Sequence, residues 1–252
     1  ILLVFAQTTI FAQKGDDSII KELEKNKEAY GAIAQQIWDY AEMGYMEEKS
    51  VALLQKTFSE EGFAIKKGVA GIPTAFTAEY GSGKPVIGIL GEFDALPGLS
   101  QERVPEQKTA GKAAGHACGH HLFGTASMAA TIAIKNWMVA NKIKGTIRFY
   151  GSPAEEGGSG KVYMVREGLF NDVDAVLHWH PNANNSANAG AALANKSAKF
   201  RFYGISAHAA GAPEKGRSAL DGVEAMNVMV NMMREHIPED ARIHYVITDG
   251  GK

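Results

Sequence analysis

Hydrophobic positions recur every three or four residues in two segments near the start of the chain. Across residues 16–43, apolar side chains follow the helical period at positions such as Ile19 and Leu23. The same pattern returns over residues 48–61 and stops at Gly62. Both segments therefore predict amphipathic helices, the second ended by a glycine.

Short apolar runs then alternate with further helical patterns. Strands are predicted at residues 63–69, 74–80, 85–91, 145–150 and 174–179, and helices at residues 122–139 and 160–167. The run PVIGILG is continuously apolar, which is typical of a strand buried on both faces. Strands that alternate with helices predict an α/β fold, a sheet with helices on its faces. Ligands of such sheets collect at the carboxyl ends of the strands.

The pattern changes after residue 182, where an asparagine-rich loop begins. A strand at residues 199–203, a helix at 217–236 and a strand at 242–248 predict the start of a second, smaller domain. We place the domain boundary near residue 194, so that residues 14–193 form the first domain and residues 194–252 begin the second.

The first thirteen residues, ILLVFAQTTIFAQ, are apolar and uncharged. They are similar to the hydrophobic region and cleavage site of a secretory signal, and we expect residues 1–13 to be a signal-peptide remnant. A buried N-terminal strand or helix is the alternative. A signal predicts a periplasmic or extracytoplasmic protein, and its absence a cytoplasmic one.

Composition narrows the range of functions. The 252 residues are 45% hydrophobic and 21% charged, as in ordinary globular proteins. The net charge is −2 and the sequence has no long basic run, so it does not predict the positively charged surface that binds nucleic acid. No apolar span is long enough to cross a membrane, so neither nucleic acid nor a membrane is an expected partner.

The segment GHACGHH, residues 115–121, contains three imidazoles and the only cysteine of the chain. If the loop is extended, His116, Cys118 and His120 point to the same side. A thiolate with imidazoles suits a borderline-soft divalent metal, and the N-terminus of the following helix is expected to favour the thiolate. A redox-active cysteine is the alternative, although no second cysteine is present to resolve it.

Two neighbouring carboxylates, Glu155 and Glu156, follow the strand predicted at residues 145–150. Adjacent loop side chains point in different directions, so one can bind a metal while the other takes a proton from water. Metal-assisted hydrolysis requires this division of roles. A solvated acidic turn is the alternative interpretation.

Two further clusters follow predicted strands. His178 and His180 lie on one side of a strand end before a proline, which favours at least one metal ligand. Glu92 and Asp94 share a side of the chain after PVIGILG. Asp94 is expected either to accept the N–H of a ligand imidazole or to cap the next turn.

Taken in order, GEFDALPGLSQ, GHACGHHLFGTA, GSPAEEGGSGK, LHWHP and SAHAAGAPEKGRSALDGVE resemble motifs of the aminoacylase/carboxypeptidase family of dinuclear metallopeptidases. The resemblance is strongest to the amidohydrolase branch. It implies a zinc-peptidase-like three-layer α/β/α catalytic domain, truncated here. It also implies the start of a smaller α+β ferredoxin-like dimerisation domain.

The resemblance also implies roles for single residues. Two divalent metal ions, Zn²⁺ or Mn²⁺, are expected on four ligands: Cys118, His120, Glu156 and His180. Glu155 matches the general base, and Asp94 matches the carboxylate that orients a metal ligand. His208 matches a histidine that reaches the active site of a neighbouring subunit and stabilises an oxyanion, which implies a homodimer.

The implied reaction is hydrolysis of the amide bond of N-acyl or aroyl amino acids, such as p-aminobenzoyl-glutamate, by a metal-activated water. The chain departs from the branch at His121, where aspartate is frequent, and Glu92 is left out of the metal set. A last histidine ligand is expected beyond residue 252, so the chain is expected to be a fragment. The alternative is a non-catalytic metal- or ligand-binding protein of the same fold.

Overall fold

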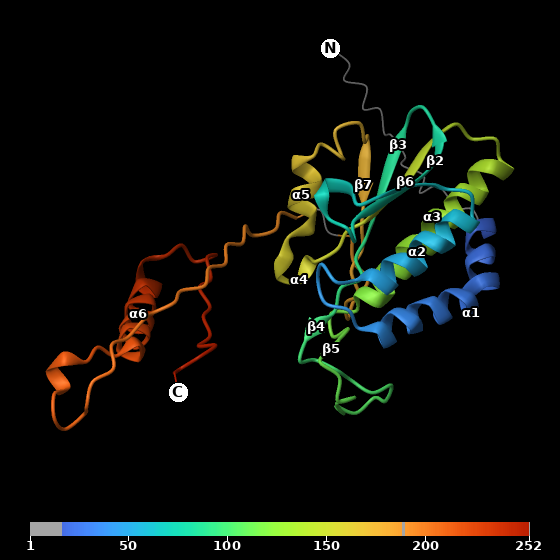
Figure 1. Ribbon diagram of the computed structural model, residues 1–252. Helices are drawn as coiled ribbons and strands as arrows, with labels where there is room; N and C mark the ends of the chain where they lie inside the picture. Colours follow the sequence, from blue (N-terminus) through green and yellow to red (C-terminus); the bar gives the residue numbers. More distant parts are fainter. Residues whose placement is uncertain (1–16, 188–189, 252) are drawn as a thin grey trace, which may run out of the picture. The chain divides into compact units, whose positions relative to one another are not determined.

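The computed structural model describes residues 17–187 and 190–251, which form two compact units that divide between Asn184 and Asn185 (Figure 1). All the predicted site residues except His208 lie in the first unit. The predicted signal remnant lies outside the described residues. The assignment of residues 14–193 and 194–252 to two domains stays a prediction.

The first unit is built on a mixed five-stranded sheet of order β1-β2-β6-β3-β7. Its strands are β1 (Ala64–Lys67), β2 (Phe76–Ser82), β3 (Val86–Gly91), β6 (Gly145–Gly151) and β7 (Ala175–Leu177). Strand β3 runs parallel to both β6 and β7, whereas β2 is antiparallel to β1 and β6. The three parallel strands therefore end at the same edge of the sheet.

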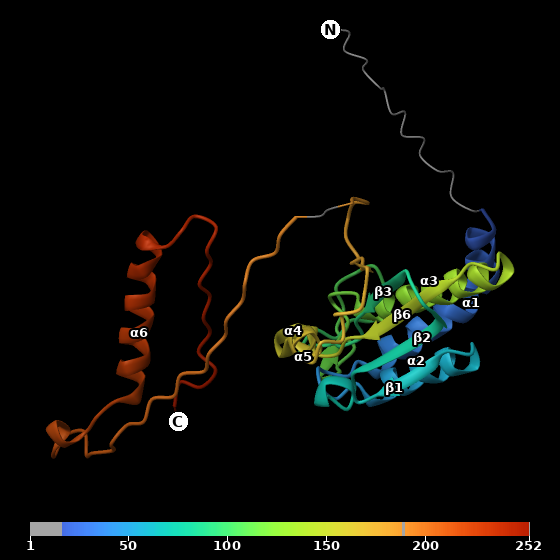
Figure 2. The ribbon, with the colours of Figure 1, turned by 90° about the horizontal axis from the view of Figure 1, so that it is seen from above.

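Three helices cover one face of this sheet (Figure 2): α1 (Asp17–Tyr40), α2 (Glu48–Glu60) and α3 (His120–Ala140). Ile147 and Phe149 of β6 pack into their core, together with Ile89 of β3. Tyr150 belongs to a second cluster with Met164 of α5 (Gly160–Arg166). Because neighbouring side chains of a strand point to opposite faces, this alternation builds the α/β/α layering.

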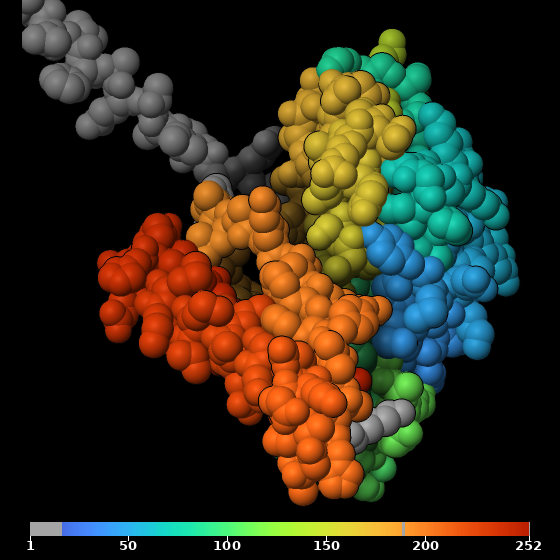
Figure 3. Space-filling model, turned by 60° about the vertical axis from the view of Figure 1, so that its left-hand side comes forward, coloured from blue at the N-terminus to red at the C-terminus, as the bar shows by residue number. Residues whose placement is uncertain are grey.

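The helical layer on the other face of the sheet is thinner. Helix α5 (Gly160–Arg166, gold in Figure 3) contributes Met164 to the core, while its side chains Val162, Tyr163 and Val165 are exposed. Short elements complete the unit: the 3₁₀ turn η1 (Val69–Gly71), the strand pair β4 (Leu96–Pro97) and β5 (Ala114–Gly115), and α4 (Glu155–Gly158).

A glycine sets how closely α3 approaches the end of β3. A Cβ added to Gly124 would lie 2.5 Å from the backbone oxygen of Glu92. No side chain fits in that space, so glycine permits the close approach of helix and strand. The approach brings the first residue of α3, His120, next to the segment that follows β3.

The predicted helices and strands of the first unit are confirmed within a few residues at each end. Helix α3 begins two residues earlier than its apolar pattern indicated, at His120. The prediction of an α/β fold with a central sheet is also confirmed. The antiparallel pairings of β2 with β1 and with β6 make that sheet mixed.

The second unit contains η2 (Pro213–Lys215), α6 (Ala219–Met233) and η3 (Arg234–His236). The Oγ atom of Ser218 caps α6 by accepting the amide N–H of Asp221 at 3.1 Å. The two strands predicted beside this helix are wrong, since residues 199–203 and 242–248 are not in strands. Among the described residues neither segment pairs with a neighbouring strand, and a strand requires such pairing.

Among the described residues, no helix combines the length and the apolar character needed to span a lipid bilayer.

Candidate metal centre

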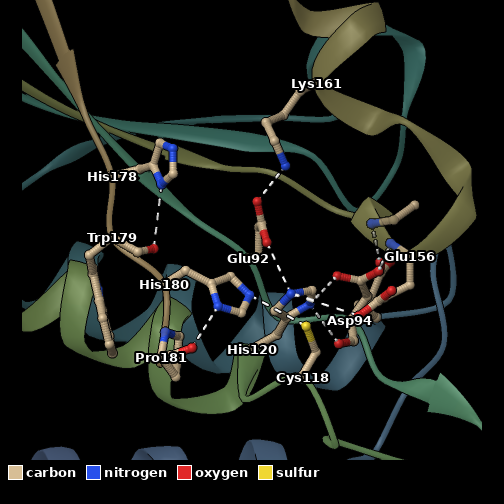
Figure 4. Close-up of polar contacts among 12 residues, drawn as sticks. Glu92, Asp94, Cys118, His120, Glu156, Lys161, His178, Trp179, His180 and Pro181 are labelled. Carbon is tan, nitrogen blue, oxygen red and sulfur yellow. Dashed lines mark hydrogen bonds and ion pairs between the residues drawn. The ribbon is translucent and has the colours of Figure 1, made fainter. Parts of the chain in front are cut away.

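The polar clusters of the first unit meet at the carboxyl edge of the parallel strands (Figure 4). Residues 92–94 follow β3, residues 152–156 follow β6, and residues 178–180 follow β7. The segment 115–119 leads into α3, whose first residue points to the same place. Four stretches of sequence thus converge on one small volume.

Two groups of side chains in this volume have ligand atoms within 4.8 Å of one another. The first consists of Cys118, His120 and His180, and the second of Glu92, His120 and Glu155. The Sγ atom of Cys118 lies 3.4 Å from Nε2 of His180. Thiol, imidazole and carboxylate donors at this spacing suit Zn²⁺ or a similar divalent cation.

Each imidazole of the first group is oriented through its other nitrogen. The Nδ1 atom of His180 lies 2.9 Å from the carbonyl oxygen of Pro181. The Nδ1 atom of His120 lies 2.9 Å from Oδ1 of Asp94. Both acceptors place the ring proton on Nδ1, so Nε2 is the nitrogen left to bind a metal.

Buried polar atoms without partners support this interpretation. His120 is fully buried, and its Nε2 atom makes no hydrogen bond, although Oε2 of Glu92 lies 3.1 Å away. Oε1 of Glu156, 4.0 Å from the same nitrogen, is also buried without a hydrogen-bond partner. Unsatisfied buried polar groups are costly, and a divalent cation between them would satisfy both.

Negative charge dominates the electrostatics. Burial by itself lowers the pKa of His120, but the hydrogen bond to Asp94 and the charges of Asp94 and Glu92 outweigh it, so the pKa is raised. Burial raises the pKa of the Cys118 thiol to about 12, with further contributions from Glu156, Glu155 and Glu92. Burial and, to a smaller extent, these carboxylates oppose the thiolate that the N-terminus of the helix is expected to favour.

His116 does not join the cluster, contrary to the expectation of an extended loop. Gly119 has φ +81° and its amide closes a turn onto the carbonyl of His116, so the alternation is broken before α3 begins. Nε2 of His116 instead lies 3.0 Å from the carbonyl oxygen of Ile37. Its ring packs against His121, and burial lowers the pKa of both imidazoles to about 4.

The paired glutamates are presented by a tight backbone turn. Ala154 has φ +54° and ψ +45°, a left-handed conformation that is unfavourable for residues other than glycine. The amide of Glu156 donates to Oδ2 of Asp94 at 2.8 Å. Asp94 thus orients His120 and holds this turn at once. Glu155 is exposed, whereas Glu156 is partly buried.

The site contains Glu92, which was left out of the expected metal set, and Lys161, which was not anticipated. Glu92 is 5% exposed and forms an ion pair with Lys161 on the first turn of α5. The signal for Glu92 was its position two residues before Asp94, on the same side of the chain. Lys161 had no sequence signal, because only the fold brings α5 to the end of β3.

The remaining histidines lie elsewhere. His178 packs near Phe123, with Nδ1 3.5 Å from the carbonyl oxygen of Trp179, and it is not in either ligand group. His208 lies in the second unit, where its Nδ1 atom accepts the amides of Ala210 and Gly211. This leaves Nε2–H as a donor, and the role of His208 stays a prediction.

The fold and the site define an α/β protein with a candidate divalent-metal centre at the carboxyl edge of its sheet, beside the exposed carboxylate of Glu155. Residues 88–244 match the model of Peptidase family M20/M25/M40. The chain belongs to this family.

Similar proteins agree with this assignment. The chain is 50% identical over 239 residues to a p-aminobenzoyl-glutamate hydrolase subunit of Escherichia coli (strain K12), covering 94% of this chain and 49% of that protein. It is 29% identical over 243 residues to the Xaa-Arg dipeptidase of Mus musculus, covering 92% and 53%. The chain spans about half the length of the curated relatives it matches.

A solved structure also agrees with the family assignment. The YXEP protein of Bacillus subtilis, described as a dinuclear metal binding peptidase from the M20 family, matches with a TM-score of 0.52 and 29% identity. The match covers 62% of this chain and 44% of that one.

Proposed function

We propose that this protein is a metal-dependent amidohydrolase that cleaves the amide bond of N-acyl or aroyl amino acids. The observation that carries the proposal is the convergence of Cys118, His120 and His180 beside the carboxylate of Glu155. The 50% identity to the p-aminobenzoyl-glutamate hydrolase of Escherichia coli supports a substrate of the p-aminobenzoyl-glutamate type.

The residues divide the chemistry as follows. A bound divalent cation supplies Lewis acidity, which polarises an amide carbonyl and makes a nearby water more acidic. Glu155, exposed at the rim of the cluster, takes a proton from the attacking water and delivers it to the leaving amine. Asp94 keeps the His120 ring oriented through Nδ1 during both steps.

We propose a pair of ions, Zn²⁺ or Mn²⁺, bound by Cys118, His120, Glu156 and His180. The dinuclear character of the similar Bacillus subtilis protein supports the pair. The thiol favours zinc, and the carboxylates accept either metal.

We further propose a homodimer in which His208 donates to the oxyanion of a neighbouring subunit. The second unit supports this with exposed apolar side chains on α6, including Val228, Met229 and Met232. Exposed apolar patches of this kind mark association surfaces. A periplasmic or extracytoplasmic location is proposed from the apolar segment 1–13 alone.

Replacing the base tests the central proposal. We expect Glu155→Gln to lower turnover of an aroyl-glutamate about 100- to 10,000-fold, because a general base contributes about that much. Metal content, measured by elemental mass spectrometry on the full-length protein, should stay at the parental level. Cys118→Ser should lower it.

Glu167→Gln, an exposed change of the same type at the end of α5, serves as the control and should retain parental turnover. Loss of metal together with activity in Glu155→Gln would make Glu155 a ligand. Metal binding without any turnover in the parent protein would favour the non-catalytic alternative.

A further inference from the structure

A buried carboxylate outside the proposed ligand set contacts the turn that presents the base. Glu47 is fully buried, and its Oε1 atom accepts the backbone amide of Ala154 at 2.8 Å. The mechanism above leaves Glu47 unused. An ionisable side chain without exposure is costly to bury, so its placement here calls for a structural or functional reason.

Glu47 ends a segment, residues 41–47, that joins two loops of the site. The carbonyl of Glu42 accepts the amide of Ala95 at 2.8 Å, and Met43 forms a β-bridge with Ala95. At its other end, the hydroxyl of Tyr45 donates to the carbonyl of Gly158 at 2.5 Å. The segment thus contacts the loop after β3 and the loop after β6.

The turn it holds is strained. Ala154 has left-handed φ and ψ angles and is fully buried. Its surroundings are close-packed, since a Cβ added to Gly44 would lie 2.9 Å from the Cα atom of Ala154. Left-handed alanine costs about 1–2 kcal/mol, so such a turn persists only where surrounding contacts enforce it.

The amides on both sides of Glu155 are bound by buried carboxylates. Glu47 accepts the amide of Ala154 at 2.8 Å, and Asp94 accepts the amide of Glu156 at 2.8 Å. A backbone held at the preceding and following residues has little freedom to rotate. These two hydrogen bonds therefore restrict the backbone position from which the Glu155 side chain projects.

We propose that Glu47 is a positioning residue that holds the backbone turn presenting the general base, acting through the amide of Ala154. The inference rests on the proposed function of Glu155. The hydrogen bond that the side-chain oxygen of Glu47 accepts holds the turn, and the negative charge of Glu47 does not contribute. The charge and the hydrogen bond can therefore be separated by substitution.

Two variants of similar volume make the separation. Glu47→Gln keeps an oxygen acceptor and removes the charge, whereas Glu47→Met removes both. In the full-length, metal-loaded protein we expect Glu47→Met to lower kcat about 100-fold, as a displacement of about 1 Å does. KM and metal content should stay near the parental values, and Glu47→Gln should retain kcat within about threefold. Glu47→Asp withdraws the acceptor by one methylene and should behave like Glu47→Met if the latter folds poorly.

The hydrogen-exchange rate of the Ala154 amide is a second measurement, and it does not depend on turnover. The amide should exchange slowly in the parent and in Glu47→Gln, and at least about 100-fold faster in Glu47→Met, because its acceptor is gone. Glu48→Gln is the control, a change of the same type at the exposed neighbouring residue that begins α2. It should leave kcat and the exchange of the Ala154 amide unchanged.

Parental kcat in Glu47→Met would overturn the proposal. So would equal losses in Glu47→Gln and Glu47→Met, because the charge would then matter, and so would loss of metal from Glu47→Met. An inactive parent would instead contradict the proposed function, with the exchange experiment still testing whether Glu47 holds the turn.

Discussion

At the scale of single residues, several carboxylates surround one imidazole. Glu92 and Asp94 are almost completely buried, and both approach His120. Lys161 forms an ion pair with Glu92. Because buried charges require compensation, the arrangement favours a divalent cation beside His120 and Glu156.

Glu47 makes stability depend on pH in a defined direction. Burial raises its pKa above the usual 4.5, so the folded protein keeps this proton to higher pH than the unfolded chain. Its contribution to stability is complete below the unfolded pKa and is lost as the pH rises through the folded value. We expect the free energy of unfolding of Glu47→Gln, relative to the parent, to increase between pH 4 and pH 8 in urea titrations.

The exposed variant Glu60→Gln on α2 controls for general charge effects and should show no comparable trend. A constant difference between Glu47→Gln and the parent across this range would contradict a buried, protonatable Glu47.

At the scale of elements, the end of α3 shows how a local motif was missed. The amide of Ile143 donates to the carbonyl of Met138 at 2.9 Å, and that of Lys142 to Val139 at 3.3 Å. These bonds form a Schellman motif with Lys142 at the left-handed position, φ +55°. Glycine is the usual residue there, so the sequence carried no signal for the motif.

Lys142→Gly should therefore stabilise the protein. Relief of the left-handed strain exceeds the greater entropy of glycine in the unfolded chain, and we expect a net gain of about 0.5–1 kcal/mol in urea unfolding. Lys144→Gly, which lacks a positive φ, should give no gain. A loss of stability in Lys142→Gly would show that the lysine side chain stabilises the helix end.

The elements of the first unit were predictable because each depends on neighbouring positions. The helical period of residues 17–40 and the apolar run of residues 86–91 stay the same in any fold that buries them. The predicted strands of the second unit failed for the opposite reason. Residues 199–203 and 242–248 alternate suitably, but a strand also needs a partner that the local pattern does not supply.

At the scale of the whole molecule, the site depends on loops that are far apart in sequence. Binding of a cation to these loops should stabilise the folded first unit by about 2.7 kcal/mol when the free metal is about 100 times its Kd. We expect a chelator to lower the Tm of the metal-loaded protein in calorimetry, and added metal to restore it. Cys118→Ser should show a smaller shift, whereas equal shifts would place the metal elsewhere.

The sequence by itself determined the helices and strands of the first unit and the residue types suited to a metal hydrolase. It also identified Asp94, Cys118, His120, His180 and the two glutamates as neighbours in space, because parallel strands end at one edge. Their assigned roles stay predictions. Only the tertiary structure decided that His116 points away, that Lys161 pairs with Glu92, and that Glu47 holds the amide of Ala154. The physical reason is that periodicity and motif spacing are local, whereas burial, charge and hydrogen bonding depend on residues that only the fold brings together.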